Sequence, residues 1–207
     1  WKYFYKRLGL KKYKNIQRIH LFEVPRFGGV VIFINIVILI FLIKNNDVQS
    51  LLGKITLAFF PAFLISLKED IFYNVRAVLR FLSLFLASAI FLSFNFSILP
   101  SFNIPMLDVY SNSHLGFLIY CFSIVAVANG SNLIDGVNGL CSFVFLIIFS
   151  CIIFLSYSVQ DISIMICASF FIFQILSFII FNYPRGIIFL GDTGAYLLGF
   201  SASPLLF

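Results

Sequence analysis

Charged residues are scarce in this chain of 207 residues, where aspartate, glutamate, lysine and arginine together make up 11% of the sequence. Soluble domains contain about 25% charged and roughly 45–50% apolar residues. Here 61% of the residues are hydrophobic. This shortage of charge excludes an ordinary water-soluble domain. Repeats and low-complexity linkers are also missing, so the sequence gives no sign of a second domain.

Patterns of cysteine and histidine that bind metals are missing as well. The four cysteines lie in or beside apolar runs without C-x-x-C spacing, and the two histidines are far apart in the sequence. Buried cysteines mostly behave as small apolar residues. We therefore interpret the cysteines as core residues rather than as metal ligands or disulfide partners.

What the sequence does contain is a series of apolar runs that approach the ~20 residues needed to cross a bilayer. The runs are continuously apolar, without the alternation of barrel strands, and a bilayer forces such segments to satisfy their backbone groups internally as helices. We predict an all-α fold, a polytopic integral membrane helical bundle of about seven to eight transmembrane helices. The predicted spans are 28–43, 51–67, 77–94, 114–128, 140–159, 162–181 and 195–207.

The organisation predicted along the chain is a single membrane domain, 1–207, with a basic segment at 1–27 and a helical bundle at 28–207. The first 20 residues are polar and basic and lack the apolar core of a signal peptide. Because the chain starts at Trp1 in this basic stretch and stops at Phe207 inside an apolar run, we expect a longer parent protein that continues beyond both ends.

The net charge of +6 would indicate a nucleic-acid partner in a soluble protein. In a membrane protein, lysine and arginine instead accumulate in cytoplasmic loops. Counting crossings gives one side with residues 1–27, 68–76, 129–139 and 182–194, and a second side with 44–50, 95–113 and 160–161. Nearly all basic residues fall on the first side. We therefore predict that the first side is cytoplasmic and that the chain binds no nucleic acid.

Four polar clusters fall on this predicted cytoplasmic side, at residues 25–29, 68–70, 129–140 and 189–194. Acidic groups at membrane depth are costly and by default indicate a functional site. The four clusters could instead be unrelated loop residues, but their position on the same side of the membrane favours one composite site.

The cluster at 129–140 places Asn132, Asp135 and Asn138 three residues apart, so that on a helical turn they would stack along one edge. Gly136 and Gly139 would let a ligand or another helix approach closely. The alternative interpretation is a polar end of the preceding helix followed by a turn.

The other acids also have two interpretations. Asp192 lies between glycines where a new helix is expected, so it suits either an N-cap or a ligand of a hard cation such as Mg²⁺. The neighbours Glu69 and Asp70 would repel each other unless a cation or proton intervened, or they simply form a solvated helix end. Three basic residues also have two interpretations: they could bind phosphates, or they could only set the orientation of the chain in the membrane. They are Arg26, Arg80 and Arg185.

The motifs N-x-x-N-L-I-D-G-V-N-G-L, from Asn129, and F-L-G-D-T-G-A-Y-L-L-G-F, from Phe189, resemble those of the polyprenyl-phosphate N-acetylhexosamine-1-phosphate transferases, members of glycosyltransferase family 4. The resemblance covers almost the whole chain. It implies transfer of a sugar 1-phosphate, expected to be an N-acetylhexosamine, from a UDP-sugar to polyprenyl (undecaprenyl) phosphate. UMP is released, and the product initiates a cell-surface polysaccharide.

Details of the motifs resemble the branch that initiates O-antigen, a part of lipopolysaccharide, more than the muramoyl-pentapeptide branch. Glu69 replaces a more common aspartate, and Asn138 replaces the second aspartate of its motif. Two departures stand out: Phe72, Tyr73 and Asn74 occupy positions where lysines often follow the acidic pair, and Ile187 replaces a basic residue.

The resemblance also implies roles for individual residues. Asp192 would bind Mg²⁺, with Mn²⁺ as an alternative ion, and Asp70 would be the base or nucleophile, with Glu69 beside it. Phe189 would lie near the uracil, and residues 25–29 would form a loop against the nucleotide. Taken together, the candidate catalytic residues are Glu69, Asp70, Asp135 and Asp192, and the candidate substrate-binding residues are Asn132, Asn138, Asn182, Phe189, Arg26, Arg80 and Arg185.

The expected partners are therefore a UDP-sugar, a polyprenyl phosphate lipid and the membrane, and a homodimer is left open. The expected location is the bacterial inner (plasma) membrane, with several crossings and the site facing the cytoplasm. Three alternatives remain: a muramoyl-pentapeptide phosphotransferase relative, an inactive fragment, and a transporter-like protein. A transporter would place its acids at mid-span, whereas here they lie at the ends of apolar runs.

Overall fold

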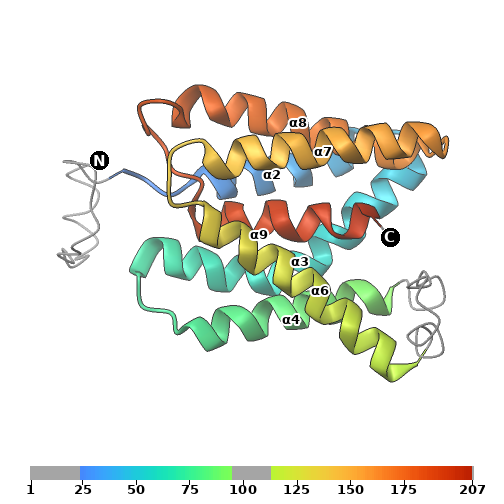
Figure 1. Cartoon of the computed structure of the whole chain (residues 1–207), viewed down its shortest axis with the longest axis horizontal. Coiled ribbons are helices and arrows are strands. Elements are labelled where there is room, and N and C mark those ends of the chain that lie inside the picture. Colours follow the sequence, from blue (N-terminus) through green and yellow to red (C-terminus); the bar gives the residue numbers. More distant parts are fainter. Residues whose placement is uncertain (1–23, 95–112, 207) are drawn as a thin grey trace.

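The computed structural model describes residues 24–94 and 113–206, and these residues form seven α-helices and one 3₁₀-helix, with no strand. The elements are α2 (Gly28–Leu42), α3 (Asn46–Phe72), α4 (Ala77–Ser93), α6 (His114–Ile134), α7 (Leu140–Ser158), α8 (Ile162–Asn182), α9 (Gly191–Ala202) and η2 (Pro204–Leu206). The prediction of an all-α bundle is confirmed (Figure 1).

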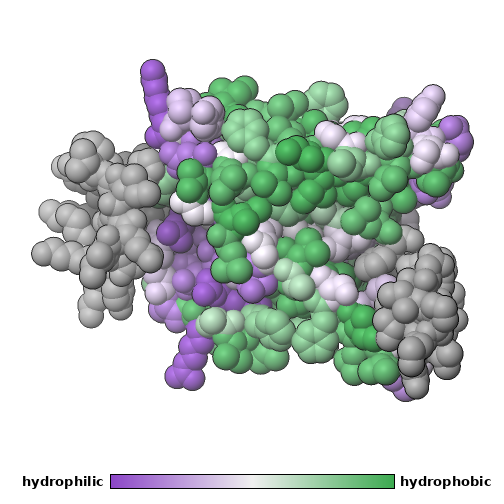
Figure 2. Space-filling view, in the orientation of Figure 1, coloured by the Kyte–Doolittle hydropathy of each residue, from purple (hydrophilic) through white to green (hydrophobic). Residues whose placement is uncertain are grey.

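Four of these helices, α3, α6, α7 and α8, are long and apolar enough to cross a membrane, and the shorter α2 and α4 are also apolar. Their outward faces carry large exposed apolar side chains, among them Phe41, Phe154 and Ile180. Figure 2 shows this hydrophobic surface over the middle of the bundle, with hydrophilic residues gathered toward its ends. Such a surface requires lipid rather than water around it, so the chain is a multi-pass membrane protein.

α3 differs most from its predicted span, 51–67, because it extends by about one turn at each end. Asn45 caps its start by accepting the N–H groups of Asp47 at 3.0 Å and Val48 at 3.1 Å. Its other end runs past the acidic pair to Phe72, where Tyr73 adopts a left-handed conformation with φ 53°. Glu69 and Asp70 therefore project from the last turns of a helix and not from a loop. The predicted loop at 44–50 is mostly helical.

α9 is the central element of the bundle, and all of its residues are buried. It contacts α2, α3, α6 and α7, and Figure 1 shows it between the α2/α7/α8 layer and the α3/α4/α6 layer. The predicted span 195–207 was misplaced, because the helix starts at Gly191 and ends at Ala202. At 1.5 Å per residue, this helix is only about 18 Å long. Its start therefore lies inside the protein, among the ends of longer helices.

Glycines allow the neighbouring helices to approach α9 closely. A methyl group added to Gly29 of α2 would lie 2.1 Å from the backbone nitrogen of Gly194. One added to Gly199 would lie 2.7 Å from the Cα of Ala128 in α6. Small residues at such crossings are typical of membrane helix packing, and they fix where the start of α9 meets the other helices.

Candidate functional site

One end of the bundle collects the polar clusters that the sequence placed on a common side. The end of α3, the start of α9 and the loops at 135–139 and 183–190 all lie at this end (Figure 1). We call it the acidic end, because Glu69, Asp70, Asp135 and Asp192 lie there. The prediction that these clusters share one end of the bundle is therefore met for the described residues.

Asp70 is the most enclosed acid of this group, with 3% of its surface exposed. Its Oδ1 accepts the backbone N–H of Asp192 at 2.8 Å. Its Oδ2 accepts the backbone N–H of Thr193 at 2.9 Å and the Thr193 hydroxyl at 2.6 Å. The first N–H groups of a helix have no partner within it, and Leu190, the N-cap residue of α9, provides no side-chain cap. A side chain from α3 thus caps α9.

Gly191 makes this cap possible. Its φ is 77°, in the left-handed region that favours glycine. A Cβ at this position would lie 2.8 Å from both carboxylate oxygens of Asp70. The glycine before Asp192 is therefore required by the close approach of the α3 carboxylate to the start of α9.

Asp192 lies in the first turn of α9 and is not its N-cap, so the N-cap interpretation of this residue was wrong. Its carboxylate forms an ion pair with Arg80, which projects from the first turn of α4. The two side chains are 11% and 23% exposed, respectively. The Nε of Arg80 is buried and has no hydrogen-bond partner among the described residues. The guanidinium therefore retains a desolvated donor next to the Asp192 carboxylate.

Asp135 lies at the C-cap of α6 and is half-buried. The pKa of this carboxyl is raised to about 7, mainly by burial and then by the negative charges of Asp192 and Asp70, while the positive charge of Arg26 opposes the rise. The charges of Asp192 and Asp70 thus act on Asp135 across the acidic end. Asp135 is consequently poised to be either neutral or ionised near physiological pH.

The asparagines of the 129–140 cluster do not stack along one helical edge. α6 ends at Ile134, so Asn132 is helical while Asn138 lies in the following turn. The Asn132 amide donates to the Tyr196 hydroxyl of α9 at 3.2 Å, and the Asn138 amide donates to the Pro184 carbonyl at 3.3 Å. The helix ends early, so the three polar groups spread over a loop that faces α9 and the 183–190 segment.

Asn182 connects the two loops of the acidic end. Its side chain is buried, with Oδ1 accepting the N–H of Gly139 at 2.6 Å and Nδ2 donating to the carbonyl of Ile188 at 2.9 Å. Gly139 has a φ of 81°, which suits glycine at this turn. The structure thus gives Asn182 a bridging role inside the protein. Its predicted contact with the nucleotide base stays a prediction.

The segment before α2 pairs with the segment before α9 through backbone hydrogen bonds. Phe189 donates its N–H to the Pro25 carbonyl at 2.9 Å and accepts the N–H of Gly28 at 3.0 Å, and Gly29 donates to Leu190 at 2.9 Å. Sequence reasoning missed this pairing, because no side-chain pattern marks it. The Phe189 ring is half-buried, and its predicted stacking on uracil stays a prediction.

The remaining candidate side chains differ in placement. Glu69 is half-buried, and its Oε2 accepts the N–H of Val75 at 2.7 Å, which orders the α3–α4 connection. The Arg26 guanidinium lies 4.8 Å from the centroid of the Tyr73 ring, a cation–π contact. Arg185 is exposed and forms no ion pair with any residue in 24–94 or 113–206. The structure therefore brings Glu69 and Arg26 near the acids but leaves Arg185 at the surface.

The donor set of the acidic end suits a hard cation held together with a ligand. Within the described ranges, no three His, Cys, Asp or Glu side chains lie close enough to form a metal cage. Magnesium is usually bound by one or two carboxylates plus phosphates and waters. Asp192 is such a carboxylate, and the surrounding acids add negative charge. Asp70 is less suitable, because both of its oxygens already bind α9.

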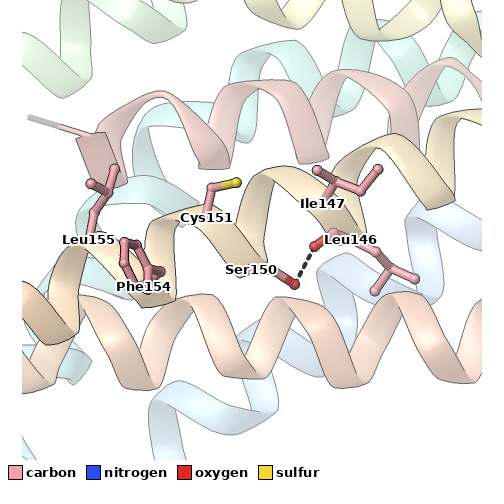
Figure 3. A pocket seen from close by; sticks show the side chains of 6 residues that line it. All are labelled: Leu146, Ile147, Ser150, Cys151, Phe154 and Leu155. Carbon is pink, nitrogen blue, oxygen red and sulfur yellow. Dashed lines mark hydrogen bonds between the residues drawn. The ribbon is translucent and has the colours of Figure 1, made fainter.

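Away from the acidic end, α7 carries a shallow apolar depression (Figure 3). The Ser150 hydroxyl in it donates to the Leu146 carbonyl at 2.7 Å, so the one hydroxyl that lines it is satisfied within the helix. The lining residues are Leu146, Ile147, Ser150, Cys151, Phe154 and Leu155. It offers no charged group and begins two turns beyond the start of α7.

The fold and the acidic end together define a membrane-embedded helical protein whose carboxylates gather where helix ends meet. Comparison with known proteins identifies the family: the sequence model of glycosyl transferase family 4 matches residues 52–206. The chain belongs to this family. The resemblance inferred from the two motifs is therefore confirmed.

Individual relatives agree with this assignment. The chain is 29% identical over 202 residues to the Bacillus subtilis (strain 168) protein named "Probable undecaprenyl-phosphate N-acetylglucosaminyl 1-phosphate transferase", covering 96% of the chain and 55% of that protein. It is 28% identical over 186 residues to the phospho-N-acetylmuramoyl-pentapeptide-transferase of Lactobacillus johnsonii, covering 84% of the chain and 58% of that protein. The chain thus spans little more than half the length of these relatives.

Proposed function

We propose that the protein to which this chain belongs transfers a sugar 1-phosphate, with N-acetylhexosamine as the expected sugar, from a UDP-sugar to polyprenyl phosphate and releases UMP. The observation that carries this proposal is Asp192, a carboxylate that lies in the first turn of the buried helix α9, is paired with Arg80 and acts electrostatically on Asp135. The names of the relatives, which refer to undecaprenyl phosphate and to sugar 1-phosphate transfer, support it.

The reaction brings together a pyrophosphate donor and a phosphate acceptor, which repel each other. A bound Mg²⁺, held by Asp192 and the donor's phosphate oxygens, would neutralise the developing charge and orient the pyrophosphate. Arg80 would add a fixed positive charge beside the same oxygens. Asn132 lies in the last turn of α6, and Asp135 and Asn138 lie in the connection between α6 and α7; these are the residues proposed to line the nucleotide and pyrophosphate pocket.

The position of the acids suits a lipid acceptor. They lie at one end of an apolar bundle, where a phosphate headgroup could reach them while its hydrocarbon tail stays in the bilayer. We propose that this end faces the cytoplasm of a bacterial cell, at the inner membrane, because most of the basic residues of the chain fall on its side. The expected outcome of cysteine labelling is that Asp135→Cys reacts from the cytoplasmic side only. Labelling from the opposite side would overturn the topology.

The direct test is an assay of the full-length parent protein in membranes with polyprenyl phosphate, Mg²⁺ and a panel of labelled UDP-sugars. Release of UMP with formation of a lipid-linked sugar is expected, and Asp192→Ala should abolish it. A matched control is Asp161→Ala, which removes an acid that caps α8 at the other end of the bundle. Full turnover by Asp192→Ala would reject the site, and no turnover with any donor would reject the reaction.

A second candidate is transfer of phospho-N-acetylmuramoyl-pentapeptide to the same lipid. The name of the Lactobacillus relative supports it. Including UDP-N-acetylmuramoyl-pentapeptide in the donor panel separates the two candidates. Use of that donor in preference to simple UDP-N-acetylhexosamines would make the second candidate correct and would remove the proposed initiation of a polysaccharide such as O-antigen.

A further inference from the structure

The acidic pair at the end of α3 consists of two side chains in very different surroundings. Asp70 is 3% exposed and accepts three hydrogen bonds from the first turn of α9. Glu69 is half-buried, and among the residues that the structure describes its hydrogen bond is from the Val75 N–H to Oε2, at 2.7 Å, which leaves Oε1 without one there. The two carboxylates are adjacent in the sequence, but a ligand can reach Glu69 more easily than Asp70.

A carboxylate that removes a proton from a phosphate, or attacks phosphorus, needs a free lone pair and direct approach of the substrate. In this arrangement three of the roughly four lone pairs of the Asp70 carboxylate already accept hydrogen bonds, and the residue is only 3% exposed, so a substrate has no direct approach to it. Gly191 closes over the carboxylate, since even a methyl group on that residue would lie 2.8 Å from either oxygen. A phosphate could reach these oxygens only if the start of α9 moved away.

The three hydrogen bonds have a clear physical consequence for Asp192. Two of them hold the backbone of Asp192 and Thr193, and the third holds the Thr193 hydroxyl. Bonds from backbone N–H groups to an ionised carboxylate are stronger than bonds between neutral groups. They therefore fix the first turn of α9, and with it the direction in which the Asp192 carboxylate points.

We propose that Asp70 is a positioning residue, which acts by capping α9 and holding Asp192 in place, and that it does not itself touch the substrate. This inference rests on the proposed function for the identity of the reaction. The capping geometry stands on the hydrogen bonds alone. It reassigns Asp70 from the role of base or nucleophile that the family resemblance implied.

Substitution of Thr193 separates two roles that substitution of Asp70 alone does not. The Thr193 side chain is uncharged and is no candidate base, so replacing it removes a hydrogen bond of the cap and leaves the Asp70 carboxylate in place. The experiment uses the full-length protein in detergent and measures Mn²⁺ binding by electron paramagnetic resonance, without any turnover. Asp70→Asn and Thr193→Val should each weaken Mn²⁺ binding by about fivefold, the effect expected from losing a helix cap. Thr193→Ser keeps the hydroxyl and should bind Mn²⁺ with the affinity of the wild type.

Kinetics supply the second readout. For both Asp70→Asn and Thr193→Val we expect a higher Mg²⁺ requirement and a kcat that recovers to within about threefold of wild type at saturating Mg²⁺. Thr56→Val is the matched control. Within the described part of the chain, the Thr56 hydroxyl donates to the Leu52 carbonyl of its own helix, so binding and turnover should stay unchanged when it is removed.

The proposal is overturned if Thr193→Val binds Mn²⁺ like wild type, or if the kcat of Asp70→Asn stays more than about 100-fold below wild type at saturating Mg²⁺. Size-exclusion chromatography and thermal unfolding identify any variant that fails to fold. If Asp70→Asn does not fold, Thr193→Val and Thr193→Ser decide the question. A parent protein that binds Mn²⁺ but transfers no sugar would reject the proposed function and leave the binding test of Asp70 intact.

Discussion

Arg80 of α4 forms an ion pair with Asp192 of α9, across 112 positions of sequence. A cation that binds Asp192 must therefore share this carboxylate with a guanidinium or displace it. A partly exposed ion pair of this kind contributes about 0.2–1 kcal/mol.

Arg80→Ala should strengthen binding of Mn²⁺ to the full-length protein by roughly 1.5–5-fold, because the competing positive charge is removed. The same variant should bind the anionic donor more weakly, and Arg80→Lys should lie between it and wild type. Metal titration and the KM for the UDP-sugar check the two effects. Weaker metal binding together with weaker donor binding would mean that the arginine supports the fold of the site and does not compete with the cation.

Asp135 should make stability depend on pH. Its pKa is raised from the ordinary 3.8 to about 7, mainly by burial and then by Asp192 and Asp70, with Arg26 opposing. The folded state therefore holds a proton that the unfolded state has lost between these values, so this contribution to stability is present below about pH 4 and disappears as pH rises through 7.

The expected result is that wild type loses thermal stability relative to Asp135→Asn as pH rises from about 4 to 7, and that the variant shows less of this dependence. Thermal unfolding in one detergent at a series of pH values measures it. Parallel pH curves for the two proteins would show that Asp135 is ionised alike in the folded and unfolded states.

The contact between α2 and α9 predicts a sharp difference between two glycines. Gly29→Ala would place a methyl group 2.1 Å from the Gly194 nitrogen and should cost at least about 1–3 kcal/mol, since backbone must move. Gly53→Ala, in α3 with nothing within 4 Å of the new Cβ, should be tolerated. Thermal unfolding of the two variants, side by side, provides the measurement. Equal stability would mean that α2 does not pack on α9 this closely.

The two loop asparagines should also differ. Asn182→Ala leaves the Gly139 N–H and the Ile188 carbonyl without their buried partner, which should cost about 1–3 kcal/mol. Asn138→Ala removes one exposed bond of 3.3 Å and should cost less than about 0.5 kcal/mol. The midpoint of unfolding distinguishes them. If Asn182→Ala were as stable as wild type but bound UDP poorly, the predicted contact with the nucleotide base would describe the role of Asn182 better than the bridging role does.

The sequence alone determined the class of protein, because scarcity of charge and continuous apolar runs leave only membrane helices as a solution. It also determined that the polar motifs lie at one end, since each pair of spans returns the chain to the same side. These conclusions need only the length and hydropathy of segments. The motifs themselves led to the family that the comparison confirmed.

The tertiary structure decided which partner each acid has. No local pattern indicates that the carboxylate of Asp70 caps a helix 122 positions later, or that Arg80 pairs with Asp192. Hydrophobicity fixes where a helix lies in the membrane but not which partner satisfies its end. That choice depends on long-range hydrogen bonds and on the close approach that Gly29, Gly191 and Gly194 allow.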